Sequence, residues 1–213
     1  MGKKRNSQKS TQDLLEAAIE VFAEHGPNAA TVNEICNKAD LNKRMLYHYF
    51  GSKENLYQQA LNHIYQQFLS VDMSLGSMLL PVEKLIEMIV RQYYDFLYKH
   101  QNFVRLICYE NLNYGRAARK LKLKGQKAPI ITALKLALKK GKAEKRFRKG
   151  IDASELMVSI LALCFFNFSN RYTIKEFAGE VAATKPAIEK RAKHVADLLL
   201  NGIMDNTKKQ NNG

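Results

Sequence analysis

Two cations stand side by side in one short stretch of the sequence, and polar aromatic residues follow them. Lys43 and Arg44 can donate hydrogen bonds to the O6 and N7 atoms of guanine, the commonest sequence-specific contact that proteins make with DNA. Tyr47, His48 and Tyr49 end in polar groups that can reach phosphate oxygens, and such contacts fix the register of a protein on a duplex. The stretch therefore combines base recognition with backbone contact.

Two predicted helix starts nearby could each hold a phosphate group. Lys53 follows Ser52, a good capping residue, so a cation would lie where the free amides and the dipole of a helix N-terminus also favour an anion. Thr31 and Glu34 have the spacing of a capping box, which predicts a second helix start. We expect Thr31 and Lys53 to contact the DNA backbone.

Two short helices joined by a tight turn would position these residues. The first begins at Thr31, and the second runs from Lys43 to Phe50. Asp40-Leu41-Asn42 forms the turn, because Asp and Asn adopt left-handed conformations more readily than other non-glycine residues, and Asn42 can cap the second helix. Such a pair is a helix-turn-helix, whose second helix enters the major groove with its N-terminal residues facing the bases. Periodicity alone also permits an ordinary helix corner whose tyrosines pack into a core.

Helical spacing extends along nearly the whole chain. Ser10-Thr11-Gln12-Asp13 predicts a capping box that opens the first helix, and Gly26-Pro27 ends it. The start of the fourth helix is expected at Lys53. No convincing run alternates as a strand would, so the predicted fold class is all-α. Further helices are predicted near residues 82–99, 101–113, 126–145, 152–172 and 185–203.

Composition favours a polyanionic partner. The chain has 213 residues and a formal net charge of +14, which suits nucleic acid first and an anionic membrane second. The longest apolar run, Leu156–Phe166, is too short to span a bilayer. The N-terminus shows no secretory signal. Three widely spaced cysteines in apolar helical patterns predict reduced core residues and a cytoplasmic protein.

The positive charge is concentrated in one segment. Between Gly115 and Gly150 there are fourteen Lys or Arg residues and one carboxylate, Glu144, a net of +13 of the total +14. Residues 1–50 have a net charge of only +1. The segment Arg116–Lys149 is either a solvated surface or an additional attraction for DNA flanking the specific site, and less plausibly a site for an anionic effector.

Signals of catalysis are missing from the sequence. The five histidines are scattered, and no H-E-x-x-H, paired Cys/His, Gly-rich phosphate loop or G-x-S-x-G pattern occurs. We therefore expect no enzyme, no metal and no cofactor.

Residues 10–57 resemble the DNA-binding domain of the TetR family of bacterial transcriptional repressors. The similarity is carried by "VFAEHG", by "TVNEIC" and above all by "LYHYFGSKENL", which fixes aromatic, turn, cap and lysine positions together. The turn departs from the family: Asp40 stands where Gly is usual, so we expect some backbone strain there. The resemblance implies operator contacts by Asn33, Asn42, Lys43, Arg44 and Met45, and phosphate contacts by Thr31, Tyr47, Tyr49 and Lys53.

The same resemblance implies a domain plan. Residues 1–9 would be a basic flexible arm, 10–56 the three-helix helix-turn-helix domain, 57–204 a larger helical domain for effector binding and dimerisation, and 205–213 a disordered tail. A dimer would match the two half-sites of a palindromic operator.

The resemblance further implies a ligand pocket between the middle helices and a dimer seam on the two late helices. An aromatic pocket with a few amides and one cation suits a medium-sized, largely apolar ligand. The pocket candidates are Tyr93, Tyr94, Phe103, Tyr109, Asn113, Phe165, Phe166, Asn167, Asn170 and Arg171. The seam candidates are Leu156, Ile160, Leu163, Cys164, Phe168, Ile188, Ala192, Val195, Leu198 and Leu199. Both sets could instead be intramolecular core.

The function expected from these observations is a ligand-responsive, TetR-type repressor that binds double-stranded DNA as a homodimer and is released by a small, largely apolar or aromatic effector. One alternative is a sequence-tolerant, basic architectural DNA-binding protein. The other is a helical small-molecule-binding protein without operator specificity.

Overall fold

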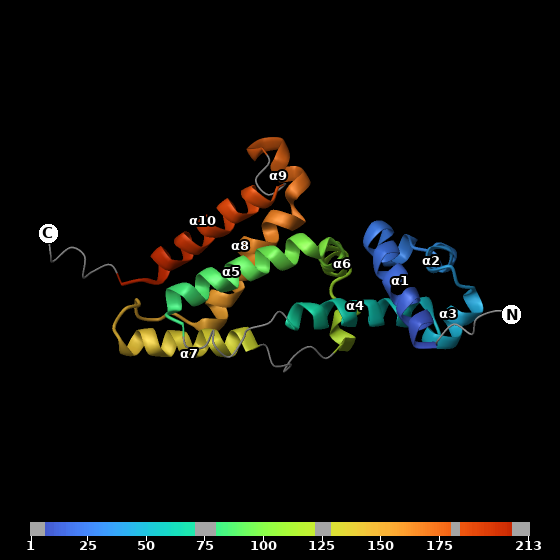
Figure 1. Ribbon diagram of the computed structural model, residues 1–213, viewed down its shortest axis with the longest axis horizontal. Helices are drawn as coiled ribbons and strands as arrows, with labels where there is room; N and C mark the ends of the chain where they lie inside the picture. The colour runs from blue at the N-terminus through green and yellow to red at the C-terminus, as the bar shows by residue number, and fades with distance from the viewer. Residues whose placement is uncertain (1–6, 71–79, 122–128, 180–183, 206–213) are drawn as a thin grey trace. The chain divides into compact units, whose positions relative to one another are not determined.

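The computed structural model describes residues 7–70, 80–121, 129–179 and 184–205 (Figure 1). Helices account for most of this part of the chain, and its only β pairing is an isolated bridge between Phe147 and Met204. The prediction of an all-α fold is confirmed. Most of the predicted arm, and all of the tail after Asp205, lie outside the described residues.

The described elements form two compact units. The N-terminal unit contains α1 (Ser7–Ala29), α2 (Val32–Ala39), α3 (Lys43–Phe50), α4 (Lys53–Leu69), α6 (Gln101–Leu112) and the 3-10 helix η2 (Ala118–Leu121). The C-terminal unit contains α5 (Val82–Lys99), α7 (Pro129–Ala143), α8 (Ala153–Ser169), α9 (Arg171–Ala178) and α10 (Lys185–Ile203). His100 alone separates α5 from α6 along the chain. The predicted division after residue 56 follows function rather than packing and stays a prediction.

The apolar face of α1 organises the N-terminal unit, where α1 packs against α2, α4 and α6. Leu14, Ala18 and Phe22 are buried on that face, and the Phe22 ring meets the Tyr57 ring of α4 edge-on at 5.1 Å. Gly26 breaks the helical path with φ 79°, as its place before Pro27 predicted. A side chain at Gly26 would stand 2.8 Å from the Tyr109 ring of α6, so this close approach requires glycine.

The predicted start of α1 is wrong. The helix begins at Ser7, and Ser10 is fully buried inside it rather than capping it. Thr11 donates its hydroxyl hydrogen to the Ser7 carbonyl oxygen, a bond typical of a helix interior. The S-x-x-D spacing therefore occurred one turn inside a helix that had already begun.

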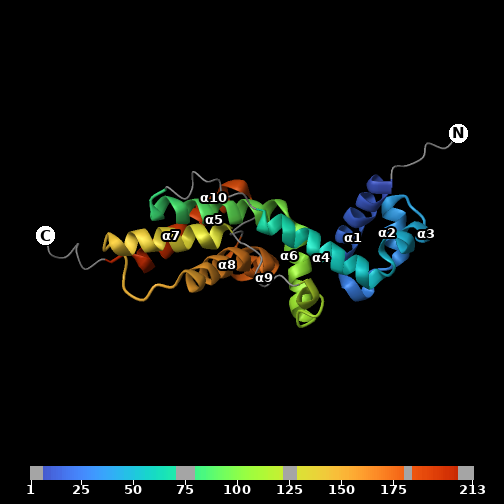
Figure 2. The ribbon, with the colours of Figure 1, turned by 90° about the horizontal axis from the view of Figure 1, so that it is seen from below.

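A buried helix, α5, organises the C-terminal unit. Its residues Leu85, Ile86, Ile89 and Val90 are fully buried, and α5 packs against α7, α8 and α10. Figure 2 shows α7 alongside α5 within this unit. The predicted ranges of α5 and α10 agree with the structure. The helix predicted over 152–172 is instead two helices, α8 and α9, which bend by 80° at Asn170.

None of the described helices is by itself long and apolar enough to cross a bilayer. Helices α8 and α9 pass that test of length and composition only when taken together, across their 80° bend.

Candidate nucleic-acid interface

Reciprocal capping fixes the start of α2. The Thr31 hydroxyl accepts from the Glu34 backbone N–H at 3.2 Å, and the Glu34 carboxylate accepts from the Thr31 backbone N–H at 2.8 Å. These hydrogen bonds, the side-chain one first, hold the pKa of Glu34 below its usual range. The predicted capping box is confirmed.

The turn between α2 and α3 has the left-handed geometry that the sequence indicated. Asp40 lies at φ 52° and ψ 45°, and the Leu41 N–H donates to the Cys36 carbonyl oxygen at 3.0 Å. A non-glycine residue in this region costs on the order of 1 kcal/mol. Asn42 then accepts the Met45 N–H through its side-chain oxygen at 3.0 Å, so it caps α3 as predicted.

Helix α3 separates its apolar and polar residues cleanly. Leu46 and Phe50 are buried against the unit, whereas Lys43, Arg44, Tyr47 and His48 are exposed. The polar side chains that could meet bases and phosphates thus point away from the core. Met45 and Tyr49 are half-buried at the edges, and Asn33 on α2 is exposed. Tyr49 packs its ring against that of His48 at 5.1 Å.

The predicted phosphate residue Lys53 is already engaged within the protein. Its ammonium donates to the carbonyl oxygens of Ala30 at 2.8 Å and Asn28 at 3.3 Å. Ser52 caps α4 through the Asn55 N–H at 3.0 Å, as predicted. Lys53 therefore joins the start of α4 to the segment that leads into Thr31, and has donor capacity left for one further acceptor.

Helix α6 is joined to α1 and α4 by residues that local sequence patterns did not reveal. Arg105 donates to the carbonyl oxygens of Ala23 and of Glu24 at the end of α1. Glu110 is buried and accepts the Tyr57 hydroxyl of α4 at 3.0 Å. Burial, and then the Glu110 carboxylate, raise the pKa of Tyr57 well above its usual range. The only sequence signal for these contacts was Glu110, a charged residue in the otherwise apolar stripe of α6.

The ten predicted pocket residues divide between the two units. Phe103, Tyr109 and Asn113 belong to the N-terminal unit, where Phe103 stacks on Phe68 at 5.1 Å. The other candidates lie in the C-terminal unit. Tyr94 is core there and donates to the Leu163 carbonyl oxygen at 3.4 Å, and its neighbour Tyr93 is also buried.

The remaining five candidates follow one another along α8 and into α9. Phe165 is half-buried and Phe166 is 58% exposed. Asn167 is buried, and its side-chain nitrogen has no hydrogen-bond partner among the described residues. Asn170 ends α8, and Arg171 lies over the ring of Tyr172 at 4.6 Å. These positions fit several roles, so a shared pocket stays a prediction.

The residues of the predicted dimer seam are almost all buried within the single chain, where they form part of the core of the C-terminal unit, and the seam itself stays a prediction. Leu163 is half-buried, and Leu198 is exposed. The buried members are Leu156, Ile160, Cys164, Phe168, Ile188, Ala192, Val195 and Leu199. Periodicity identified the buried stripe of each helix, but could not tell which surface buries it.

Comparison with known proteins agrees with this geometry. Residues 14–60 match the family described as "Bacterial regulatory proteins, tetR family", and residues 81–199 match "Tetracyclin repressor-like, C-terminal domain". The chain belongs to the TetR family. This TetR-family protein is 31% identical over 200 residues to the HTH-type transcriptional repressor NicS of Pseudomonas putida, a match that covers 93% of this chain and 94% of that relative.

Solved structures share the fold of this TetR-family protein. FadR of Bacillus subtilis in complex with stearoyl-CoA has a TM-score of 0.66 at 19% identity, covering 90% of this chain and 98% of that one. The flavonoid-responsive regulator FrrA has a TM-score of 0.60 at 24% identity, covering 94% and 100%. The expected family and fold are both confirmed.

Proposed function

We propose that this TetR-family protein is a transcriptional repressor that binds a palindromic operator as a homodimer and is released from it by a small, largely apolar or aromatic effector. The observation that carries DNA recognition is the polarity of α3. Lys43 and Arg44 extend from its first turn, while Leu46 and Phe50 anchor its opposite side. A recognition helix needs this arrangement, because its N-terminal residues must reach base edges.

The contacts we propose divide by chemistry. Asn33, Asn42, Lys43, Arg44 and Met45 would meet the operator bases. The Asn42 side-chain oxygen already accepts one hydrogen bond as the cap of α3, and its amide hydrogens and second lone pair remain for a base. Thr31, Tyr47, His48, Tyr49 and Lys53 would meet phosphates, which fix register and carry little sequence information.

A dimer seam is better supported on the outward side of α8 than on the side predicted from sequence. Val158 is 60% exposed and Phe166 is 58% exposed, and the eight-residue spacing places them on one side of the helix with Ala162 between them. Leu198 is an exposed apolar residue of α10. Apolar residues exposed along a helix in this way are typical of an association surface.

The side-chain nitrogen of Asn167, which is buried without a hydrogen-bond partner in the described part of the chain, supports an effector site. Burying an unpaired polar group costs about 1–3 kcal/mol, and a ligand bearing a hydrogen-bond acceptor would remove that cost. Any effector acts only through its different affinity for the DNA-binding and released states. We also infer that the protein is a regulator rather than an enzyme and acts in the bacterial cytoplasm, where its target DNA lies.

Selection of bound duplexes from a random DNA pool at about 150 mM salt tests the proposal, since specificity has meaning only at a stated salt concentration. We expect enrichment of a two-fold symmetric sequence, and band shifts on it that saturate at two protomers per duplex. Recovery of unrelated sequences with equal affinity would contradict operator recognition and favour an architectural role.

A further inference from the structure

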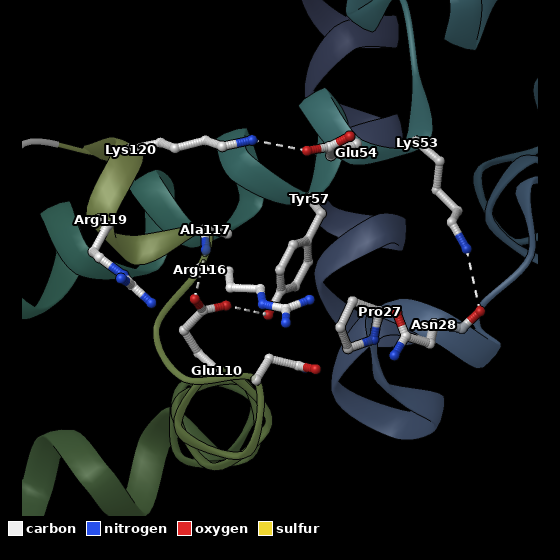
Figure 3. Close-up of a pocket in the computed structure, with 11 residues that line it drawn as sticks. Pro27, Asn28, Lys53, Glu54, Tyr57, Glu110, Arg116, Ala117, Arg119 and Lys120 are labelled. Atoms are coloured by element: carbon white, nitrogen blue, oxygen red, sulfur yellow. Dashed lines mark hydrogen bonds and ion pairs between the residues drawn. The ribbon is translucent and has the colours of Figure 1, made fainter.

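A cavity of about 910 Å³ lies within the N-terminal unit, where the start of α4, the end of α1 and the segment from α6 into η2 come together (Figure 3). Its lining is rich in charge. Four cations surround it, while the carboxylates are Glu54 and Glu110. The cations are Lys53, Arg116, Arg119 and Lys120.

Most of these charges are already satisfied inside the protein. The buried Glu110 carboxylate accepts the Tyr57 hydroxyl and the N–H groups of Ala117 and Ala118 at 2.7 and 3.0 Å. Lys120 forms an ion pair with Glu54 at 2.8 Å, and both side chains are exposed. An exposed ion pair of this kind adds little net stability, so Lys120 can exchange Glu54 for another anion.

Arg116 differs from its neighbours. Its guanidinium is exposed and makes no hydrogen bond or ion pair within the described residues, although it lines the cavity. The turn that carries it is well fixed: Tyr114 and Gly115 both have positive φ, and Arg119 donates to the carbonyl oxygens of both. A free guanidinium on a fixed turn is suited to bind an anion that the chain does not supply.

Hydrogen bonds connect this turn to the proposed phosphate-binding residues. Lys120 pairs with Glu54, which adjoins Lys53, and the Lys53 ammonium contacts the Ala30 carbonyl. Ala30 precedes Thr31, the cap of α2. Arg116 and Lys120 thus line the same cavity as Lys53, one of the groups that would face the DNA backbone.

We infer that Arg116, assisted by Lys120, binds a backbone phosphate of the duplex outside the half-site that α3 enters. This inference rests on the proposed DNA-binding function. It also divides the basic segment of the sequence: Arg116, Arg119 and Lys120 belong to the N-terminal unit that holds the helix-turn-helix, whereas the cations from Lys135 to Lys149 belong to the C-terminal unit.

Salt titration of affinity tests the inference with Arg116→Gln. Each phosphate contact contributes about 0.9 to the magnitude of the slope of log K against log salt. The slope of a dimer, which loses one contact in each protomer, should therefore fall in magnitude by about 1.8. The loss should be equal on operator and on random DNA of the same length, and Arg116→Lys should retain the wild-type slope. Lys38→Gln is the matched control, because Lys38 is an exposed cation of the same unit, paired with Glu20 on α1; its slope should not change.

A second arm shortens the operator duplex from both ends until only the two half-sites remain. The wild-type slope should fall to that of Arg116→Gln, and the two proteins should then be indistinguishable. An Arg116→Gln slope equal to wild type on long duplexes overturns the inference. The inference is also overturned if Arg116→Gln loses pyrophosphate binding in calorimetry but binds DNA as wild type does. That result would identify the cavity as a site for a free phosphate compound.

These outcomes are separable from failure of the proposed function. A wild-type protein that selects no symmetric sequence fails as an operator-binding repressor, yet its slope on random DNA still reports whether Arg116 contacts phosphate. Circular dichroism of each variant should match wild type, because the Arg116 side chain makes no hydrogen bond or ion pair with the residues that the structure describes.

Discussion

The Lys53 ammonium lies 2.8 Å from the carbonyl oxygen of Ala30. It thereby ties the first turn of α4 to the residue that precedes the cap of α2. The position that the family resemblance assigns to a phosphate is thus also a structural link within the DNA-binding unit. Substitution of Lys53 will combine two effects, which must be measured apart.

Lys53→Ala should destabilise the protein and weaken DNA binding together. Loss of two hydrogen bonds from a charged donor should cost about 1–3 kcal/mol in the free energy of unfolding, measured by urea denaturation. Binding to operator and to random DNA should fall by the same factor, because a phosphate contact carries no sequence information. An unchanged denaturation midpoint would show that the link contributes nothing to stability.

Arg44→Ala and Tyr47→Phe should separate base recognition from backbone contact. Arg44→Ala should reduce the free-energy preference for operator over random DNA by about 1–3 kcal/mol. Tyr47→Phe should lower both affinities equally, without the stability loss of Lys53→Ala, because Tyr47 is half exposed. Fluorescence anisotropy on matched duplexes measures both ratios. Equal losses on both duplexes for Arg44→Ala would exclude it as a base contact.

The turn residue Asp40 should tolerate Gly and resist Val. Asp40 has φ 52°, which a β-branched residue adopts only with strain, so Asp40→Val should lose about 1–3 kcal/mol in thermal denaturation. Asp40→Gly should stay within about 1 kcal/mol of wild type, since relief of strain and the added chain entropy oppose each other. A Val variant as stable as wild type would mean that the turn relaxes to another geometry.

The two sides of α8 should respond differently to substitution. Val158→Glu places a charge on the exposed side and should give a folded monomer in sedimentation equilibrium, with the wild-type helical spectrum. Ile160→Ala acts on the fully buried side and should destabilise the protein by about 2–5 kcal/mol. If Val158→Glu remains dimeric at the same dissociation constant, the outward side of α8 is not the seam.

The buried thiol of Cys164 should be inert in the native protein. Burial raises the pKa of Cys164 to about 12, above its usual value of about 8.5. The folded state thus retains the proton more strongly, so this group's contribution to stability is complete below about pH 8.5 and is lost as the pH rises toward 12. A thiol reagent at pH 8 should modify half-buried Cys108 first and reach Cys164 only on unfolding. Fast modification of Cys164 would show that α8 opens locally.

Local patterns predicted what local interactions decide. The capping box at Thr31, the cap at Asn42 and the left-handed Asp40 each depend on residues within four positions, and all three are confirmed. The bounds of α5 and α10 were equally accessible, because proline and cap residues mark their starts.

Long-range packing decided what the sequence could not reveal. Arg105 and Glu110 join α6 to α1 and α4, across more than fifty positions, so no window of sequence indicates the grouping. Seam residues such as Ile160 fit a dimer and a core equally well until the fold shows which surface covers them. The sequence did not reveal the break at Asn170, because the apolar run before it keeps the helical period.

One residue, His100, is all that lies between α5 and α6 along the chain. Helix α6 in turn holds the end of α1 through the hydrogen bonds that Arg105 donates. Because this connection is so short, it is the natural place for an insertion: we expect that a few glycines added after His100 leave DNA binding intact and weaken the response to an effector.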